Sequence, residues 1–220
     1  MAPTLKVLFH VKREPEIRAE VSRLRSQASA LGVELSEDAA SKLLRLESLL
    51  RERAVPAGMI AAGDAGRLRE RHVLDCLRAA AVVRADDARA LDLGSGAGLP
   101  GIVVAIAVPW LSVTLVERRQ RRAAFCELAV ERLGLENVRV RAARIEDLTE
   151  DADLCFARAL APIEEAWRLA EPLLREGGRL VYFAGRGARG PFSAPGARCL
   201  STVDAPVLEG SGPLVIMGRQ

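Results

Sequence analysis

The sequence has few of the residues on which metal sites and nucleophilic sites depend. Its four cysteines form none of the close CxxC pairs that zinc sites favour, so we predict no metal site and reduced, buried thiols at Cys76, Cys126, Cys155 and Cys199. Only two histidines are present. No apolar run approaches the roughly 18 to 20 residues of a membrane span, and Met1-Ala2-Pro3 leads into a charged segment rather than an apolar signal. We therefore expect a soluble, cytoplasmic protein without membrane contact.

Composition sets broad limits on the remaining possibilities. Half of the 220 residues are hydrophobic, which is enough to bury a substantial core in one large domain or in a domain with an appendage. Lysine and arginine number 32 against 29 acidic residues, so the net charge is +3. That excess is too small to identify a nucleic-acid-binding protein by itself, although it leaves room for local arginine patches.

The first part of the chain predicts a basic arm followed by helices. In the arm, residues 1–14, Lys12 either contacts a phosphate or belongs to an ordinary chain end. Helical spacing predicts helices over 15–31, from the N-cap Ser36 onward and over 67–84, with a loop at 54–66. We expect residues 1–87 to form an N-terminal arm and helical appendage.

From residue 88 onward, short apolar runs alternate with amphipathic helices. Strands are expected at 90–93, 113–116, 138–140, 154–157 and 179–183, helices at 118–133 and 162–175, and a closing antiparallel pair at 199–203 and 214–217. The alternation predicts a doubly wound α/β sheet over residues 88–220, whose ligand lies outside the carboxyl ends of the strands.

A glycine-rich turn, residues 91–101, follows the first of these strands. Gly96–Gly101 fits the G-x-G-x-x-G pattern of dinucleotide sites, which is a weak signal alone. Pro100 lacks a backbone N–H that a pyrophosphate would need, whereas S-adenosylmethionine has no phosphate. An acidic residue beside the turn, Asp92, suits the ammonium group of its methionine part. We therefore predict S-adenosylmethionine rather than a nicotinamide dinucleotide.

Two further segments end strands at the same edge. Glu117 ends the second strand, where a carboxylate accepts hydrogen bonds from ribose hydroxyls; the alternative is a surface acid that faces the adjacent arginines. Arg144–Asp147 follows the third strand, where a polar and apolar pair brackets an adenine. The two segments predict where the nucleoside part of the ligand lies.

Four motifs carry a resemblance to a known family. They are Arg71-His72-Val73-Leu74-Asp75, the glycine turn, Arg144-Ile145-Glu146-Asp147 and Ala157-Arg158-Ala159. Through them the sequence resembles the small-subunit ribosomal RNA methyltransferase G family, also called glucose-inhibited division protein B. The resemblance implies a Rossmann-like class I methyltransferase with a mostly parallel seven-stranded sheet. It also implies methyl transfer from S-adenosylmethionine to N7 of a guanosine in 16S ribosomal RNA, as naked RNA or within the small subunit. We expect a monomer.

The resemblance also implies roles for individual residues. It places Arg158 where cofactor and substrate meet, and Arg144 is the arginine beside Ile145 and Glu146 in their motif; Arg158 and Arg144 are the catalytic candidates. His72 and Asp75 match a helix motif against the pocket. Of the cofactor-binding candidates, the resemblance gives Gly94, Leu99, Ile145, Glu146 and Arg158, and the residue patterns themselves give Asp92, Ser95, Gly96, Gly98 and Glu117. The RNA-binding candidates come from their charge and are Lys12, Arg118, Arg119 and Arg186; for Arg118 and Arg119 the alternative is a solvated helix face paired with Glu127 and Glu131.

Two segments depart from the family's usual sequence. Ala54–Ile60 replaces a tryptophan-asparagine pair and an asparagine-leucine-threonine segment, and Gly185-Arg186-Gly187 replaces lysine-glycine. Arg186 keeps a cation but not the same point donor. Both departures bear on the RNA substrate more than on the cofactor.

The implied reaction needs no general base, and the roles of Arg158 and His72 have alternatives. Guanine N7 has a lone pair and no proton to lose, so alignment is sufficient without a general base. Arg158 either binds guanine O6 or a phosphate, or pairs with Asp92 or Glu117. His72 is either part of the site or a polar core residue. The alternative functions are methylation of another RNA or a small molecule, and a non-catalytic ribosome-assembly or RNA-binding role.

Overall fold

One seven-stranded sheet carries the fold, and its strands come from the short apolar runs of the chain after residue 88. The computed structural model describes residues 14–204, 208 and 210–220; Lys12 lies outside the described residues. The α-helices are α1 Glu14–Ser29, α2 Glu37–Leu49, α3 Asp75–Ala80, α4 Gly101–Ala107, α5 Gln120–Leu133 and α6 Ile163–Ala170. The strands are β1 Arg89–Leu93, β2 Ser112–Val116, β3 Val138–Arg141, β4 Ala152–Arg158, β5 Leu174–Phe183, β6 Ala197–Val203 and β7 Leu214–Arg219. Shorter π-helical or 3₁₀ segments are Leu50–Ala54, Ala62–Arg67, Arg69–Leu74, Ile145–Asp147 and Glu171–Leu173.

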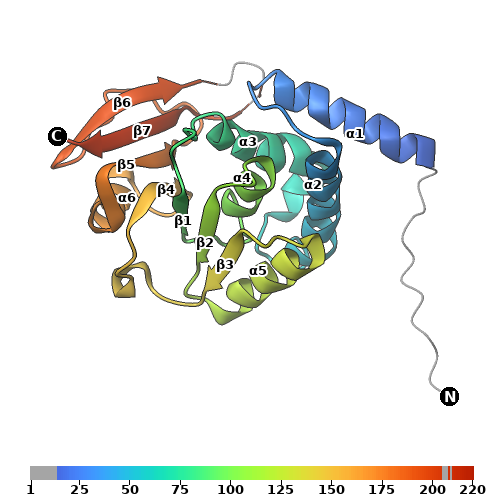
Figure 1. Ribbon diagram of the computed structural model, residues 1–220, viewed down its shortest axis with the longest axis horizontal. Helices are drawn as coiled ribbons and strands as arrows, with labels where there is room; N and C mark the ends of the chain where they lie inside the picture. Colours follow the sequence, from blue (N-terminus) through green and yellow to red (C-terminus); the bar gives the residue numbers. More distant parts are fainter. Residues whose placement is uncertain (1–13, 205–207, 209) are drawn as a thin grey trace.

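The strand order in the sheet is β3-β2-β1-β4-β5-β7-β6 (Figure 1). The first five strands are parallel, and β7 pairs antiparallel with both β5 and β6. The chain order changes direction between β1 and β4, and in such a sheet a crevice opens at that point outside the carboxyl ends of the strands. The structure confirms the predicted doubly wound sheet and its closing antiparallel pair.

Helices cover both faces of the sheet because the central strands are apolar on both sides. Ala90 and Phe156 pack in one cluster with α4 and α5, whereas Leu91 and Cys155 pack in a second cluster with Trp167 of α6. This alternation has the period of two that a pleated strand imposes. The two helical layers lie on opposite sides of the sheet in Figure 1.

The N-terminal helices share a core with the sheet. Buried residues of α1 and α2, such as Leu24 and Leu43, belong to the same cluster as Ile102 of α4 and Leu115 of β2. The predicted N-cap is confirmed, because the Ser36 hydroxyl accepts a hydrogen bond of 3.1 Å from the backbone N–H of Ala39. In the described part of the chain, no helix combines the length and the apolar character that crossing a membrane requires.

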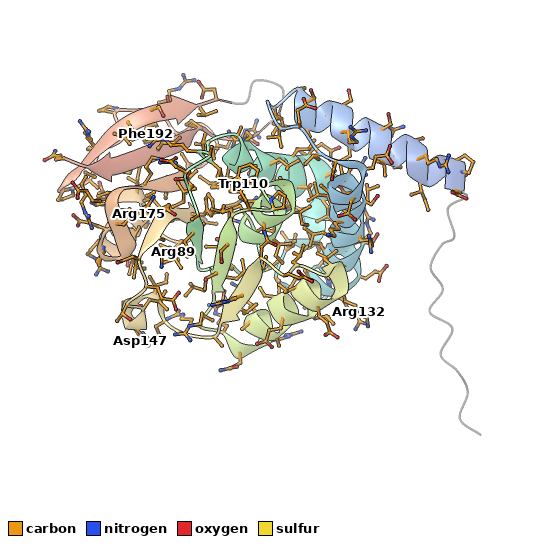
Figure 2. All side chains as sticks on the ribbon, in the orientation of Figure 1. Arg89, Trp110, Arg132, Asp147, Arg175 and Phe192 are labelled. Carbon is orange, nitrogen blue, oxygen red and sulfur yellow. The ribbon has the colours of Figure 1, made fainter. Side chains whose placement is uncertain are left out.

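The structure corrects two helix boundaries. The helix predicted over 67–84 is a π-helical segment followed by α3, and it ends at Ala80. The helix predicted over 162–175 ends at Ala170, since Leu174 already pairs with Ala152 as the first residue of β5. Arg175, labelled in Figure 2, thus lies on a strand and forms an ion pair with Asp153.

One cysteine also departs from expectation. Three thiols are buried as predicted, but Cys199 is exposed. It lies on the edge strand β6, where residues 198–202 are all exposed because no helix of the described chain packs over them. One extra residue, Leu200, interrupts the pairing of β6 with β7, since Cys199 pairs with Met217 and Ser201 with Ile216.

Candidate functional site

The glycine turn joins β1 to α4 in a conformation that requires glycine. Gly94, Gly96 and Gly98 have φ angles of +72°, +59° and +78°. The backbone N–H groups of Gly94 and Ser95 both donate to the carbonyl of Val116, at 2.9 and 3.0 Å, so the turn is fixed to the carboxyl end of β2. A Cβ on Gly98 would collide with the side chain of Ile102, the second residue of α4. The turn is therefore closed on the helix side and open on the outer side.

Asp92 stabilises this turn by a hydrogen bond to the start of α4. Its side chain is 1% exposed, and Oδ2 accepts a hydrogen bond of 3.0 Å from the backbone N–H of Gly101 at the start of α4. Burial raises the pKa of Asp92 to about 7, against the opposing effects of the hydrogen bonds from Gly101 and Ser95. Asp92 lines neither of the two cavities at this edge. Its carboxylate is directed at the start of α4, and a contact with the ammonium group of the cofactor stays a prediction.

Two adjoining cavities lie at the carboxyl ends of the parallel strands. The larger, of about 630 Å³, lies over β1, β4 and β5 and is lined by Leu99, Arg158 and Tyr182, among others. The smaller, of about 330 Å³, lies over β2 and β3. Both are lined by Gly94, Arg122 and Ala159, so they form one divided crevice at the point where the strand order reverses.

The smaller cavity contains the acidic strand end that the sequence identifies. Glu117 is 5% exposed; its Oε2 accepts from the Gly96 N–H at 3.0 Å and its Oε1 from the Arg119 N–H at 2.8 Å. Ile145 and Glu146 line the same cavity. The pKa of Glu146 is lowered by its own backbone N–H and by Arg144, which lies 3.3 Å away. A buried carboxylate near an apolar side chain suits a nucleoside.

The larger cavity contains Arg158. It is held by hydrogen-bond acceptors of the π-helical segment Arg69–Leu74 and of the first residue of α3. Its guanidinium donates to the carbonyl of Arg71 at 3.0 Å, to Nδ1 of His72 at 3.1 Å and to Asp75 at 3.4 Å. The ion pair with Asp75 replaces the alternative pairings with Asp92 or Glu117, which are wrong. Arg158 thus lies at a fixed position in the crevice.

The remaining predicted residues fall on different sides of the crevice. Arg144, Arg118 and Arg119 line the smaller cavity, whereas Ser95, Gly96, Leu99 and Arg186 line the larger one. The structure therefore does not bring Arg144 and Arg158 together. Gly98 lines neither cavity. Cys155 is buried in the sheet, where burial raises the pKa of its thiol.

Two contributions to the crevice are not identified from the sequence. Tyr182 lines the larger cavity and donates from its hydroxyl to the Ala161 carbonyl at 3.1 Å, and residues 210–212 enter from the segment before β7. Arg122, of the arginine cluster that follows Glu117, lines both cavities. For Tyr182 there is a signal, since it is the only tyrosine and lies near the end of a predicted strand. Residues 210–212 give none, because their place depends on how the antiparallel pair closes the sheet.

Comparison with known proteins agrees with this geometry. A family model described as rRNA small subunit methyltransferase G matches residues 39–201. A relative from Thermobifida fusca (strain YX), named ribosomal RNA small subunit methyltransferase G, is 43% identical over 146 residues, which cover 66% of this chain and 61% of the relative. A relative of the same name from Chromohalobacter salexigens is 39% identical over 168 residues, which cover 76% of this chain and 80% of the relative.

A solved structure shares the fold at low identity. The mitomycin 7-O-methyltransferase MmcR aligns with a TM-score of 0.58 and 16% identity, over 93% of this chain and 68% of that chain. This likeness confirms the predicted Rossmann-like class I methyltransferase fold. Because the family model covers most of the sequence, the chain belongs to the rRNA small subunit methyltransferase G family.

Proposed function

We propose that this protein transfers a methyl group from S-adenosylmethionine to N7 of a guanosine in 16S ribosomal RNA. The observation that carries the proposal is the divided crevice, in which one cavity has the groups of a nucleoside site around Glu117 and the other holds a fixed arginine, Arg158. Family membership supports the reaction and the ribosomal RNA substrate. We further propose that the protein works as a monomer in the cytoplasm, on naked RNA or on the small subunit.

The smaller cavity and the glycine turn fit the cofactor. Glu117 offers carboxylate oxygens for ribose hydroxyls, and Ile145 offers an apolar contact for the adenine. Gly94 and Gly96 have no Cβ, so a ligand approaches the backbone of the turn closely. We propose that Arg144 steadies Glu146 on this side of the crevice rather than taking part in methyl transfer. When bound, S-adenosylmethionine supplies an electrophilic methyl group.

The larger cavity fits the target base. Arg158 presents a planar set of N–H donors, which suits guanine O6 or a phosphate oxygen. Guanine N7 loses no proton when it is methylated, so the protein only has to align it. Accordingly, both ring nitrogens of His72 are already engaged, one by Arg158 and the other by Asp64.

Exposed arginines at the rim fit the RNA backbone. Arg118 and Arg119 lie at the smaller cavity and Arg186 at the larger one, and all three are exposed. Guanidinium groups bind phosphates in a forked geometry, and such contacts weaken as salt concentration rises. These arginines would hold the strand on either side of the target nucleotide.

Methyl transfer to RNA tests the proposal directly. Small subunits and naked 16S RNA are prepared from cells that lack the enzyme, labelled with radioactive S-adenosylmethionine, and the methylated atom is mapped. We expect label on N7 of one guanosine. Arg158→Ala should reduce turnover by roughly 100-fold, whereas Arg168→Ala, an exposed control on α6, should not change it. Label on another atom, or on neither RNA, would contradict the proposal.

Calorimetry tests the cofactor separately. S-adenosylmethionine should bind and NAD should not, and Glu117→Gln should weaken S-adenosylmethionine binding by about tenfold because one charged acceptor is lost. Glu127→Gln changes an exposed residue on α5 and serves as the matched control. Tight binding of NAD in place of S-adenosylmethionine would refute the assignment of the crevice.

A further inference from the structure

A chain of polar contacts crosses from the helical segments to the end of β4. Arg158 is held by the Arg71 carbonyl, by His72 Nδ1 and by Asp75 Oδ2. The other oxygen of Asp75 accepts from Arg78 at 2.6 Å. Asp75 is thus shared by two arginines, so His72 and the Arg71 carbonyl are the acceptors directed to Arg158 alone among the described contacts.

The partners of His72 determine which of its nitrogens carries the proton. A guanidinium only donates hydrogen bonds, so Nδ1, at 3.1 Å from Arg158, must carry no proton. A carboxylate only accepts, so Nε2, at 3.2 Å from Asp64, must be the protonated nitrogen. His72 is therefore a neutral imidazole in a single tautomer, and neither nitrogen is free to act as a base.

The surroundings of His72 keep it neutral. Its ring is mostly buried, and burial together with the positive charge of Arg158 lowers its pKa below the ordinary value. Arg71, on the same segment, acts in the same direction, while Asp64 opposes it. Asp75 is the remaining charged group of this chain of contacts, and it faces Arg158 rather than the imidazole.

We infer that His72 is a positioning residue for methyl transfer, whose unprotonated Nδ1 holds the guanidinium of Arg158 in place in the larger cavity. The inference rests on the proposed function only in that Arg158 acts on the target base. Protonation of His72 places an N–H on Nδ1 opposite an N–H of Arg158, and two donors cannot share that contact. The arginine then loses one of its acceptors, and methyl transfer slows as the pH falls.

Matched variants of His72 separate positioning from folding. The amide oxygen of His72→Asn lies near the place of Nδ1 and accepts from Arg158, but it does not titrate. His72→Leu removes the acceptor. We expect turnover of His72→Asn within about threefold of the wild type with no loss on acidification, and turnover of His72→Leu about tenfold lower at all pH values. The KM for S-adenosylmethionine should be unchanged in both, since Glu117 is untouched.

Nuclear magnetic resonance tests the same geometry without the reaction. In His10→Gln the only histidine is His72, and its ¹⁵N signals should show the Nε2–H tautomer at neutral pH and a pKa below the ordinary value. The Nδ1–H tautomer would overturn the inference. So would an acid loss of turnover that persists in His72→Asn, or equal turnover of His72→Leu and the wild type. If the wild type methylates no RNA, the proposed function fails, and the ¹⁵N signals still decide the placement of His72.

Discussion

Arg69 is the point at which three helical segments meet, and its removal should destabilise the protein strongly. Its guanidinium binds both carboxylate oxygens of Glu47 on α2, at 2.9 and 3.0 Å, and Glu20 on α1 at 2.8 Å. The side chain of Arg69 is 16% exposed and that of Glu47 is 7% exposed. The two carboxylates raise the pKa of Arg69 further above its already high value.

The loss of stability in Arg69→Met is set by the unpaired carboxylate of Glu47. Arg69→Met keeps the apolar stem but leaves the buried carboxylate of Glu47 without its partner. Removing one member of a buried ion pair costs about 3–5 kcal/mol, and the small exposure of Arg69 places this case near the lower end, at about 3 kcal/mol. In a chain of this length that loss lowers Tm by roughly 6 to 12 °C.

Urea unfolding followed by circular dichroism measures the loss. Arg18→Met removes an exposed arginine paired with Glu14 and should change the free energy of unfolding by less than about 0.5 kcal/mol. The double variant Glu47→Gln with Arg69→Met should recover at least about half of the loss, because the buried charge of Glu47 is gone and Glu20 keeps its ion pair with Arg23. A loss below about 1 kcal/mol for Arg69→Met, or losses that simply add in the double variant, would refute this reasoning.

Three further outcomes are expected. Gly98→Ala should lower the free energy of unfolding by about 2 kcal/mol, because φ is +78° and the new Cβ meets Ile102. The control Gly63→Ala adds its Cβ to open space and should leave the stability unchanged, so equal urea midpoints for the two variants would contradict this prediction. A thiol reagent should label Cys199 alone in the folded protein and all four cysteines in urea, and fast labelling of a second thiol would show that a buried cysteine is accessible. The pKa of Asp92, about 7 when folded against 3.8 ordinarily, means that the folded state binds more protons between these values, so stability should fall as the pH rises from about 4 to about 7. Asp92→Asn should remove this dependence of the free energy of unfolding on pH. If the free energies of the wild type and Asp92→Asn differ by the same amount throughout this pH range, the pKa of Asp92 is not raised.

Features set by local sequence are the ones that sequence reasoning predicts well. The capping hydroxyl of Ser36, the strands of the parallel sheet and the end of α5 at Gly134 all follow from residues close together in the chain. The crevice at the carboxyl edge follows as well, because the fold class fixes where the glycine turn and Glu117 meet.

Contacts between residues far apart in the chain are the ones that sequence reasoning misses. Arg158 pairs with Asp75, a carboxylate 83 residues away, whereas the sequence suggests Asp92 or Glu117 as its ion-pair partners. The direction of the Asp92 side chain also depends on the sheet, since strand alternation places its carboxylate toward α4. The helix predicted over 162–175 includes Arg175, whereas β5 begins at Leu174 and continues through Gly177 and Gly178.

The interruption at Leu200 has a consequence for how this protein behaves at high concentration. A terminal strand presents a row of unused N–H and C=O groups that another molecule can pair with, and growth of a shared sheet between molecules begins there. In β6 the extra residue interrupts that row near its middle, so another strand can pair in register with only a short stretch of β6 on either side of it. The opposite edge, β3, is four residues long and carries Arg139 and Arg141. Both borders of the sheet thus oppose fibril-like association, and deleting Leu200 should make the purified protein more prone to aggregate.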